Sequence, residues 1–263
     1  MTRVILYYQT FRTPHGEFIS LDSVLYPGTP VTHIHLAAIH FGVDSDNTPY
    51  IHLNNRVPSD IYFNPVWKTV QRAVAKNIKI VVMIGGAGGG YASLFSDFGT
   101  YYKLLVDFLH QHPYISGVDL DIEEKCDISN IKKLINKLVT DFGEEYLITV
   151  APVEGALSSD TPGMGGFCYK ELLHSPEGSY LDYLNCQAYN NYSLGSLDAI
   201  VNNGYNVTQV VMGMISGQDY KTELAKMVNK YGNRLGGVFI WEYFNAIPSP
   251  KGWVGNISGL IKL

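Results

Sequence analysis

Three carboxylates stand at every second position of one short segment: Asp119, Asp121 and Glu123. In a β-strand, side chains alternate between two faces, so these three acids share one face and the aliphatic residues between them share the other. Neighbouring acids on that face lie roughly 6.5–7 Å apart, since a strand rises ~3.3 Å per residue. Their charges repel, so at least one carboxyl should keep its proton. A protonated carboxylic acid beside an ionised one is what general acid catalysis requires.

An edge strand whose acids face water is the alternative interpretation of this segment. The residues between the acids are Val118, Leu120 and Ile122, and the segment begins with Gly117. Aliphatic residues in this arrangement are typical of a strand buried in a parallel sheet. We therefore favour a catalytic role for the three acids.

A folded framework must hold the three acids in place, and the pattern of the rest of the chain indicates which fold this is. Short apolar runs alternate with amphipathic stretches that carry apolar residues at helical spacing. This alternation predicts a parallel sheet with helical crossovers, and eight strands close a TIM-type barrel. A doubly wound open sheet is the alternative. The expected strands cover residues 3–9, 33–41, 79–84, 117–123, 146–152, 183–190, 208–214 and 236–242.

One insertion and no domain boundary are expected in this barrel. Turn residues in the stretch 42–49 precede Tyr50-Ile51-His52-Leu53, which predicts a hairpin after the second strand. No linker, repeat or low-complexity segment divides the chain. We expect one catalytic (β/α)8 barrel domain over residues 1–263.

In a TIM barrel, the active site lies at the carboxyl ends of the strands. Glu123 closes the expected fourth strand and should reach the rim, with Asp121 and Asp119 progressively deeper. Gln187 and Tyr189 share a face of the sixth strand and should point inward, where they supply hydrogen-bond donors.

Two aromatic positions complete the expected rim. Trp241 ends the last strand, where a flat indole suits the face of a sugar ring. Glu242 should point away from Trp241 and is not expected to be catalytic. One of Tyr7 and Tyr8, at the end of the first strand, must face the interior.

The sequence gives little support to a phosphate-binding site or a metal-binding site. The glycine-rich stretch 85–90 lacks the Lys-Ser/Thr of a phosphate-binding loop, and it more simply leaves room for a ligand or backbone. His33, His35 and His40 have the spacing of metal ligands, yet a His-rich inner strand is more often hydrogen-bonded structure. We expect no metal and no cofactor.

The composition of the chain limits the kinds of binding partner that we expect. The chain has 46% hydrophobic and 16% charged residues and a net charge of −5, without a basic cluster, so we expect no nucleic acid. No apolar run reaches the ~18 residues of a membrane span, and we expect no membrane partner. The three cysteines are too scattered for a disulfide framework. We expect a monomer; nothing at the N-terminus resembles a signal peptide, and the compartment stays open.

With these motifs in place, the chain resembles glycoside hydrolase family 18, which contains chitinases and endo-β-N-acetylglucosaminidases. The family's fourth-strand motif is Asp-Gly-x-Asp-x-Asp-x-Glu, and here residues 116–123 match it except that Ser116 replaces the first Asp. The third-strand Ser-x-Gly-Gly reads Met83-Ile84-Gly85-Gly86, with its Ser lost. Residues 187–190 match the sixth-strand pattern, and Trp241 matches the final-strand tryptophan.

The chain is most similar to the compact fungal-type endo-β-N-acetylglucosaminidases of this family. The supporting segments are Tyr7-Tyr8-Gln9, Ile51-His52-Leu53-Asn54, Ala151-Pro152-Val153 and Trp241-Glu242-Tyr243-Phe244-Asn245. The chain is too short for the large α+β insertion of bigger members, which implies a shallower cleft.

The resemblance implies a role for each matched residue. Glu123 would protonate the glycosidic oxygen and later activate water, while the substrate's own 2-acetamido oxygen serves as nucleophile. Asp121 would orient the acetamide, and Asp119 would hydrogen-bond Asp121. Tyr189 would hold the acetamide oxygen, and Trp241 would form the floor under the sugar. The candidate sugar-binding residues are Trp241, Gln187, Asn190, Tyr7, Gly85, Gly86 and Met212.

Four functions follow as hypotheses. The first is retaining endo-hydrolysis of β-1,4 bonds between N-acetylglucosamine units in the chitobiose core of N-glycans, with a carbohydrate as the partner. Chitin hydrolysis is the second. A catalytically silent lectin and an unrelated metal-dependent barrel hydrolase are the others.

Overall fold

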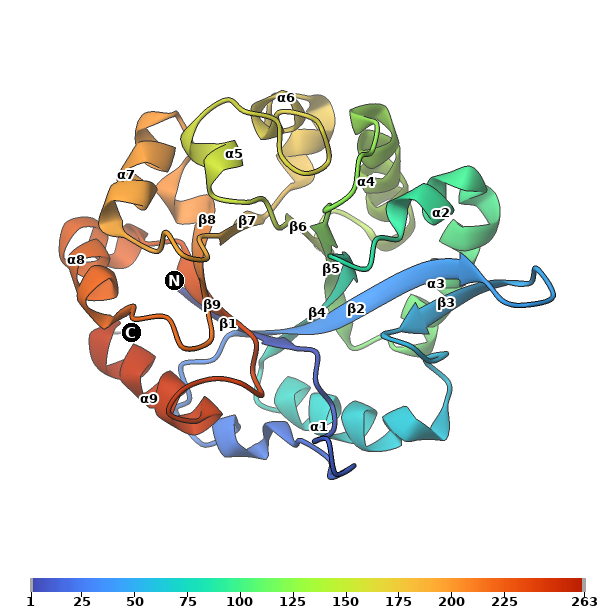
Figure 1. The fold of residues 1–263 in the computed structure, drawn as a ribbon, viewed down its shortest axis with the longest axis horizontal. Coiled ribbons are helices and arrows are strands. Elements are labelled where there is room, and N and C mark those ends of the chain that lie inside the picture. Colours follow the sequence, from blue (N-terminus) through green and yellow to red (C-terminus); the bar gives the residue numbers. More distant parts are fainter. Residues whose placement is uncertain (1, 262–263) are drawn as a thin grey trace.

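The computed structural model describes residues 2–261, which form a closed barrel of eight parallel strands surrounded by helices (Figure 1). Seven neighbouring pairs follow the order β1-β9-β8-β7-β6-β5-β4-β2, and the β1–β2 pair closes the ring. The predicted TIM barrel is therefore confirmed. The strands are β1 Arg3–Tyr8, β2 His33–Val43, β3 Pro49–Leu53, β4 Lys79–Gly85, β5 Ile115–Asp121, β6 Leu147–Val150, β7 Tyr183–Gln187, β8 Val210–Ile215 and β9 Gly237–Trp241.

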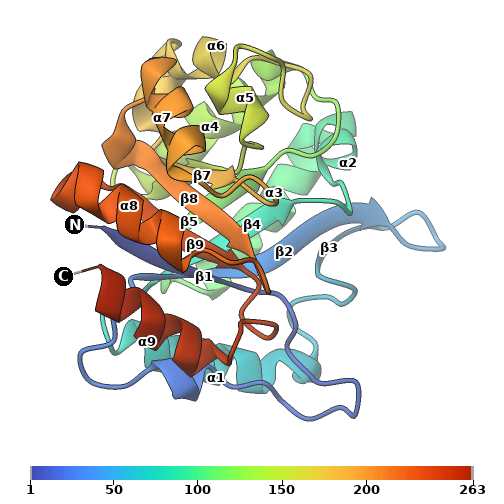
Figure 2. The same ribbon diagram turned by 60° about the vertical axis from the view of Figure 1, so that its left-hand side comes forward.

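Nine α-helices in the described residues cover the outside of the barrel (Figure 2). Asp97 and Asp127 accept hydrogen bonds from the first backbone N–H groups of α3 and α4, and Ser249 does so for α9, which fixes where these helices begin. The helices are α1 Asn64–Val74, α2 Tyr91–Ser96, α3 Phe98–Gln111, α4 Ile128–Phe142, α5 Gly155–Ser158, α6 Tyr169–Leu173, α7 Leu194–Asn202, α8 Lys221–Tyr231 and α9 Pro250–Leu260. Short 3-10 helices are η1 Leu21–Val24, η2 Ile61–Phe63, η3 Pro176–Tyr180, η4 Val207–Gln209 and η5 Gly232–Arg234.

The barrel strands are buried on both faces, as their continuous apolar runs predict. The outward-facing residues join the helices in one large cluster, whereas a smaller cluster fills the barrel interior. The interior cluster contains large rings, among them Tyr7, Tyr183 and Phe239. The interior of the barrel is thus filled with side chains, as in other TIM barrels.

The β2–β3 hairpin is the main departure from a simple barrel. β2 continues beyond the ring to Val43 and pairs with β3 in antiparallel register, as expected for residues 42–53. The hairpin projects past the rim of the barrel in Figure 2. Between β8 and α8 the chain needs only residues 216–220, so the described chain has no α+β insertion at that connection.

Three strands, β5, β6 and β7, end two or more residues earlier than the sequence patterns predict. β5 ends at Asp121, and β7 ends at Gln187, so Glu123, Tyr189 and Asn190 lie in the loops that follow. None of the helices in the described part of the chain has both the length and the apolar character of a bilayer-crossing segment.

Candidate active site

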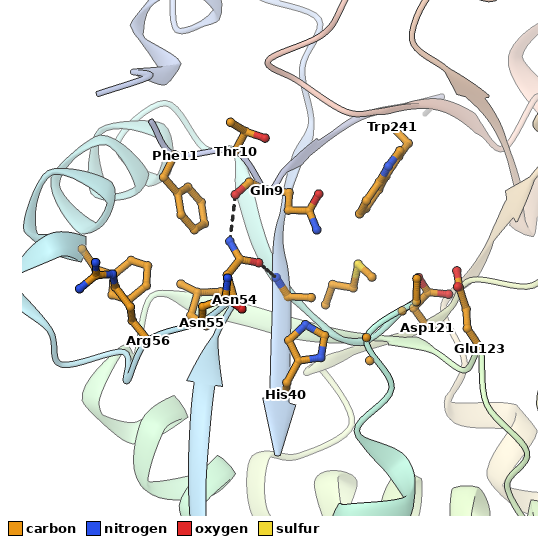
Figure 3. A pocket seen from close by; sticks show the side chains of 18 of the residues that line it. Gln9, Thr10, Phe11, His40, Asn54, Asn55, Arg56, Asp121, Glu123 and Trp241 are labelled. Atoms are coloured by element: carbon orange, nitrogen blue, oxygen red, sulfur yellow. Dashed lines mark hydrogen bonds between the residues drawn. The ribbon is translucent and has the colours of Figure 1, made fainter. Parts of the chain in front are cut away.

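A pocket of about 580 Å³ opens at the carboxyl ends of the barrel strands. Asp121 and Glu123 lie at one end of it, and Arg56 lies at the other (Figure 3). Gln187, Tyr189 and Trp241 also line the pocket, as predicted from the ends of the sixth and last barrel strands. The structure therefore brings acids, an amide and aromatic rings from several strands to one place.

Asp119 lies at the base of this group and is fully buried. Tyr7 Oη and Thr149 Oγ1 each donate to its carboxylate at 2.6 Å, Asn185 Nδ2 donates at 3.0 Å, and His35 Nδ1 lies 3.3 Å from Oδ2. Burial alone would raise the pKa of Asp119, but the hydrogen bonds and the neighbouring His35 lower it below the usual aspartate value. Asp119 is therefore held as a buried anion.

Asp121 is also buried but has far less hydrogen bonding. Its pKa is raised well above the ordinary value, first by burial and then by the charges of Glu123 and Asp119. Gln187 donates to it, with Nε2 2.9 Å from Oδ1, and this bond lowers the pKa less than burial and the neighbouring acids raise it. The raised pKa favours the protonated form of Asp121, in the direction expected for one of the three acids.

Gln187 connects the two upper acids. Its Nε2 donates to Asp121 at 2.9 Å, to the Ala151 carbonyl at 2.8 Å and to Glu123 Oε1 at 3.3 Å. The contact with Ala151 fixes the direction of the amide, so Gln187 holds Asp121 and Glu123 at a defined separation. Glu123 is only half-buried and faces the pocket, where a substrate oxygen can reach it.

Gly85 and Gly86 line the pocket because the chain needs a left-handed turn close to Asp121. Their φ angles are +91° and +82°, which side chains rarely allow. A Cβ on Gly85 would lie 2.4 Å from the Asp121 carbonyl oxygen, and one on Gly86 would lie 2.6 Å from the Met83 methyl group. These two glycines therefore make room for Asp121, whichever sugar enters.

Aromatic rings form the wall next to the acids. Trp241 is half-exposed in the pocket and packs on Tyr7 with ring centroids 5.4 Å apart. Tyr189 packs against Phe239 in the same interior cluster. Burial, followed by the charges of Asp121 and Glu123, raises the pKa of Tyr189 well above that of a free phenol, so its hydroxyl stays a donor.

Three of the expected sugar-contacting residues lie outside the pocket. Tyr7 is buried below it and donates to Asp119 instead, so it supports an acid and does not reach a ligand. Met212 points to the outer layer against the helices, because strand alternation turns its neighbour Val211 inward. Asn190 lies exposed in a left-handed turn beyond the end of β7. These three residues therefore do not line the pocket that holds Asp121 and Glu123.

The opposite wall of the pocket was not predicted from the sequence. Asn54, which follows β3, accepts from the Ala38 N–H at 3.1 Å and donates to the Gln9 carbonyl at 3.0 Å (Figure 3). These bonds tie the end of the hairpin to the ends of β1 and β2. The residues that this wall adds to the pocket are Gln9, Thr10, Phe11, Arg12, His40, Asn54, Asn55, Arg56, Tyr62 and Phe63.

Two further expectations concerned Glu242 and the histidines. Glu242 accepts from the N–H groups of Gln9 and Thr10 at 3.1 and 3.0 Å, so it fastens β9 to β1 and turns away from the pocket. His35 is hydrogen-bonded inside the barrel, and His40 Nδ1 lies 2.9 Å from the Gly89 carbonyl. Over residues 2–261, no group of three or more His, Cys, Asp or Glu side chains is arranged to hold a metal ion.

Comparisons with known proteins agree with this geometry. A fungal endo-β-N-acetylglucosaminidase of glycosyl hydrolase family 18 superposes with a TM-score of 0.89 at 28% identity, over 100% of this chain and 99% of that one. ChiC, a chitinase of Aspergillus fumigatus, has a TM-score of 0.85 at 34% identity, over 98% and 99%. A family 18 chitinase of Pseudoalteromonas aurantia, at 19% identity and a TM-score of 0.73, shares the fold.

Sequence comparisons give one family. No curated protein sequence matches the chain. The family model described as "Glycosyl hydrolases family 18" matches residues 3–218, which include the acids of β5 and the residues that hold them. Since that match spans most of the barrel, the chain belongs to glycoside hydrolase family 18.

Proposed function

We propose that this glycoside hydrolase cuts the β-1,4 bond between the two N-acetylglucosamine units of the N-glycan core, with retention of configuration. The observation that carries the proposal is the arrangement of one pocket-facing acid, Glu123, above the buried acid Asp121, whose pKa is raised. Both are held by Gln187 beside Trp241. The likeness to the fungal endo-β-N-acetylglucosaminidase over the full length of both chains supports the choice of substrate.

In this reaction Glu123 acts first as an acid. Its proton passes to the glycosidic oxygen as the bond from that oxygen to the anomeric carbon breaks, so the leaving sugar departs as an alcohol. The carbonyl oxygen of the substrate's 2-acetamido group forms a new bond to the same carbon from the opposite face. The product of this step is a cyclic oxazolinium cation, and no enzyme carboxylate is attached to the sugar.

In the proposed reaction, Asp121 and Tyr189 interact with the 2-acetamido group of the substrate. The positive charge that forms next to Asp121 favours its carboxylate form, so the pKa of Asp121 falls as the ring closes. The buried anion Asp119 adds a fixed negative charge beneath it. Tyr189 keeps its phenolic proton and is positioned to donate to the acetamide oxygen.

In the second step, Glu123 acts as a base. Its carboxylate takes a proton from water, whose oxygen attacks the anomeric carbon and opens the oxazolinium ring. The acetamide is restored, Glu123 regains its proton, and two inversions give net retention. Trp241 packs under the sugar ring throughout and excludes water from its lower face.

Mass spectrometry of two parallel incubations tests the proposal. One incubation contains a high-mannose glycoprotein and the other contains a chitin hexamer, each with wild type and with Glu123→Gln. We expect wild type to release a glycan and leave one N-acetylglucosamine on the protein, and Glu123→Gln to release none. Binding of both sugars without turnover by wild type would favour the lectin hypothesis.

Chitin is the second candidate substrate, and the 34% identity to ChiC favours it. The chemistry at Glu123 would be unchanged, because both substrates present the same 2-acetamido group at the scissile bond. Dimers or trimers released from the hexamer, with the glycoprotein left intact, would establish a chitinase.

A further inference from the structure

Two arginines at the far end of the pocket have no part in the proposed reaction. Arg12 follows β1 and Arg56 follows β3, and both line the same pocket as Asp121 and Glu123. In Figure 3, Arg56 and the two acids lie at opposite ends. The pocket is therefore negative at the end that holds Asp121 and Glu123 and positive at the opposite end.

Tyr62 holds both guanidinium groups in place. The Arg12 and Arg56 guanidinium carbons each lie 4.8 Å from the centroid of the Tyr62 ring. A guanidinium that stacks on an aromatic ring keeps the N–H groups along its edge free, and its side chain has fewer rotamers left to lose on binding. The pair is therefore already ordered for a ligand.

In the described residues, both guanidinium groups keep N–H donors without a partner and a positive charge that is only partly neutralised. Arg12 Nη1 donates to the Gly16 carbonyl at 3.0 Å, and Arg56 Nη1 donates to Asp60 at 3.1 Å. Asp60 shares its carboxylate with the Tyr62 N–H, to which it is bound at 2.8 Å. In the part of the chain that the structure describes, no salt bridge accompanies Arg12, so two cations face one carboxylate.

A neutral sugar chain does not account for this pair. Hydroxyl groups of mannose or N-acetylglucosamine can be bound by the amides and hydroxyls of Gln9, Thr10, Asn54 and Asn55, which line the pocket between the two ends. A planar guanidinium instead matches carboxylate and phosphate oxygens, which it binds through two parallel hydrogen bonds. The chain as a whole carries a net charge of −5, so this positive end is a local feature.

We propose that Arg12, Arg56 and Tyr62 form a subsite for an anionic group, phosphate or carboxylate, carried by the glycan on the side of the pocket away from the scissile bond. This inference rests on the proposed function only in taking the pocket as the glycan site. It makes acidic glycans the preferred substrate class. A purely structural role would instead use the same stacking to fasten the loop after β3 to the loop after β1.

Binding to the Glu123→Gln protein tests the subsite without turnover. Calorimetry would compare a high-mannose oligosaccharide that carries one phosphate monoester with the same oligosaccharide after phosphatase treatment. A third arm uses a sialylated oligosaccharide, which separates carboxylate from phosphate. We expect at least one acidic ligand to bind about tenfold or more tightly than the neutral one, the size of a charge-assisted hydrogen-bond pair. This preference should shrink as the salt concentration rises from about 0.05 to 0.5 M.

Matched variants identify the residues responsible. Arg12→Gln/Arg56→Gln should weaken binding of the acidic ligand far more than binding of the neutral one and so remove the preference, and Arg56→Lys should keep only part of it, because an ammonium cannot form two parallel hydrogen bonds. Arg234→Gln removes one positive charge from the exposed 3-10 helix η5 before β9 and should leave the preference unchanged. Thermal unfolding of each variant reports any purely structural effect.

The inference is overturned if acidic and neutral ligands bind alike, if neither binds, or if the double variant weakens both equally. Cleavage of the neutral glycoprotein is scored separately, with wild-type protein. Glu123-dependent cleavage without an acidic preference would leave the proposed function standing and remove the subsite. An acidic preference in binding without any cleavage would leave the subsite standing and remove the proposed function.

Discussion

His35 and Asp119 lie side by side in the barrel interior, both fully buried, with Nδ1 3.3 Å from Oδ2. The family motif has a serine on the third barrel strand that this chain replaces with Met83, which cannot donate a hydrogen bond. His35, Thr149, Asn185 and Tyr7 together surround the carboxylate in its place. The deepest acid is thus held by side chains from four strands, β1, β2, β6 and β7.

His35→Phe should therefore shift the pH profile. The variant keeps a ring in the cavity but removes one of the groups that lower the pKa of Asp119, so that pKa rises. If the reaction needs Asp119 ionised, the acid limb of kcat against pH should move to higher pH, and kcat near neutrality should fall about tenfold. Tyr183→Phe is the control, because its hydroxyl contacts the other ring nitrogen of His35, at 3.2 Å. An unchanged acid limb in His35→Phe would contradict the role.

Glu123→Gln should lower kcat by at least ~10²–10⁴, the usual worth of general acid help, while sugar binding survives. The exposed acid Glu171 on α6 supplies the control, since Glu171→Gln removes an equal charge far from the pocket. Single-turnover kinetics and calorimetry measure the two effects separately. A Glu123→Gln protein that keeps wild-type kcat would eliminate Glu123 as the acid.

Asp121→Asn should abolish most turnover and yet stabilise the fold at neutral pH. The pKa of Asp121 is raised in the folded state, so the folded protein binds more protons than the unfolded chain between the two pKa values. Its contribution to stability is present below the unfolded pKa of about 3.9 and is lost as the pH rises through the folded value. The gain in Tm from Asp121→Asn should therefore appear near pH 7 and vanish near pH 4. A lower Tm at neutral pH would contradict the raised pKa.

Glu242→Ala should affect folding more than chemistry. Its buried carboxylate accepts from two backbone N–H groups and from the Thr10 hydroxyl, which lose their partner in the variant. Leaving such groups unpaired costs roughly 1–3 kcal/mol. Urea denaturation should show this loss, and the pH profile of kcat should keep its shape, because Glu242 lies outside the pocket lining.

Activity should survive EDTA at millimolar concentration. The proposed steps use only carboxyl groups, the substrate's acetamide and water, so chelation removes nothing that they need. Inactivation by EDTA that Zn²⁺ or Mg²⁺ reverses would point to the metal-dependent hydrolase considered as an alternative.

Residue patterns predicted the barrel and the acid triad well, because both depend on local periodicity. The alternation of acids with aliphatic residues in residues 117–123 specifies a strand and the face on which the acids lie. Such periodicity does not say which of two faces points into the barrel, and this is why Met212 was misplaced. The pocket wall of Arg12, Arg56 and Tyr62 could not be predicted, since it depends on contacts between loops more than forty residues apart.

Because of the β2–β3 hairpin, the two ends of the pocket are built from different parts of the chain. The groups proposed to break the bond sit on β5, β7 and β9 and the loops directly after them, whereas the far wall of the pocket comes from the loop after β1 and from the chain that returns from the hairpin. The proposed selectivity and the proposed hydrolysis thus depend on separate stretches of polypeptide. Transplanting residues 9–12 together with residues 42–63 from a relative is consequently a direct route to re-engineering which glycans are accepted, with the hydrolytic machinery left intact.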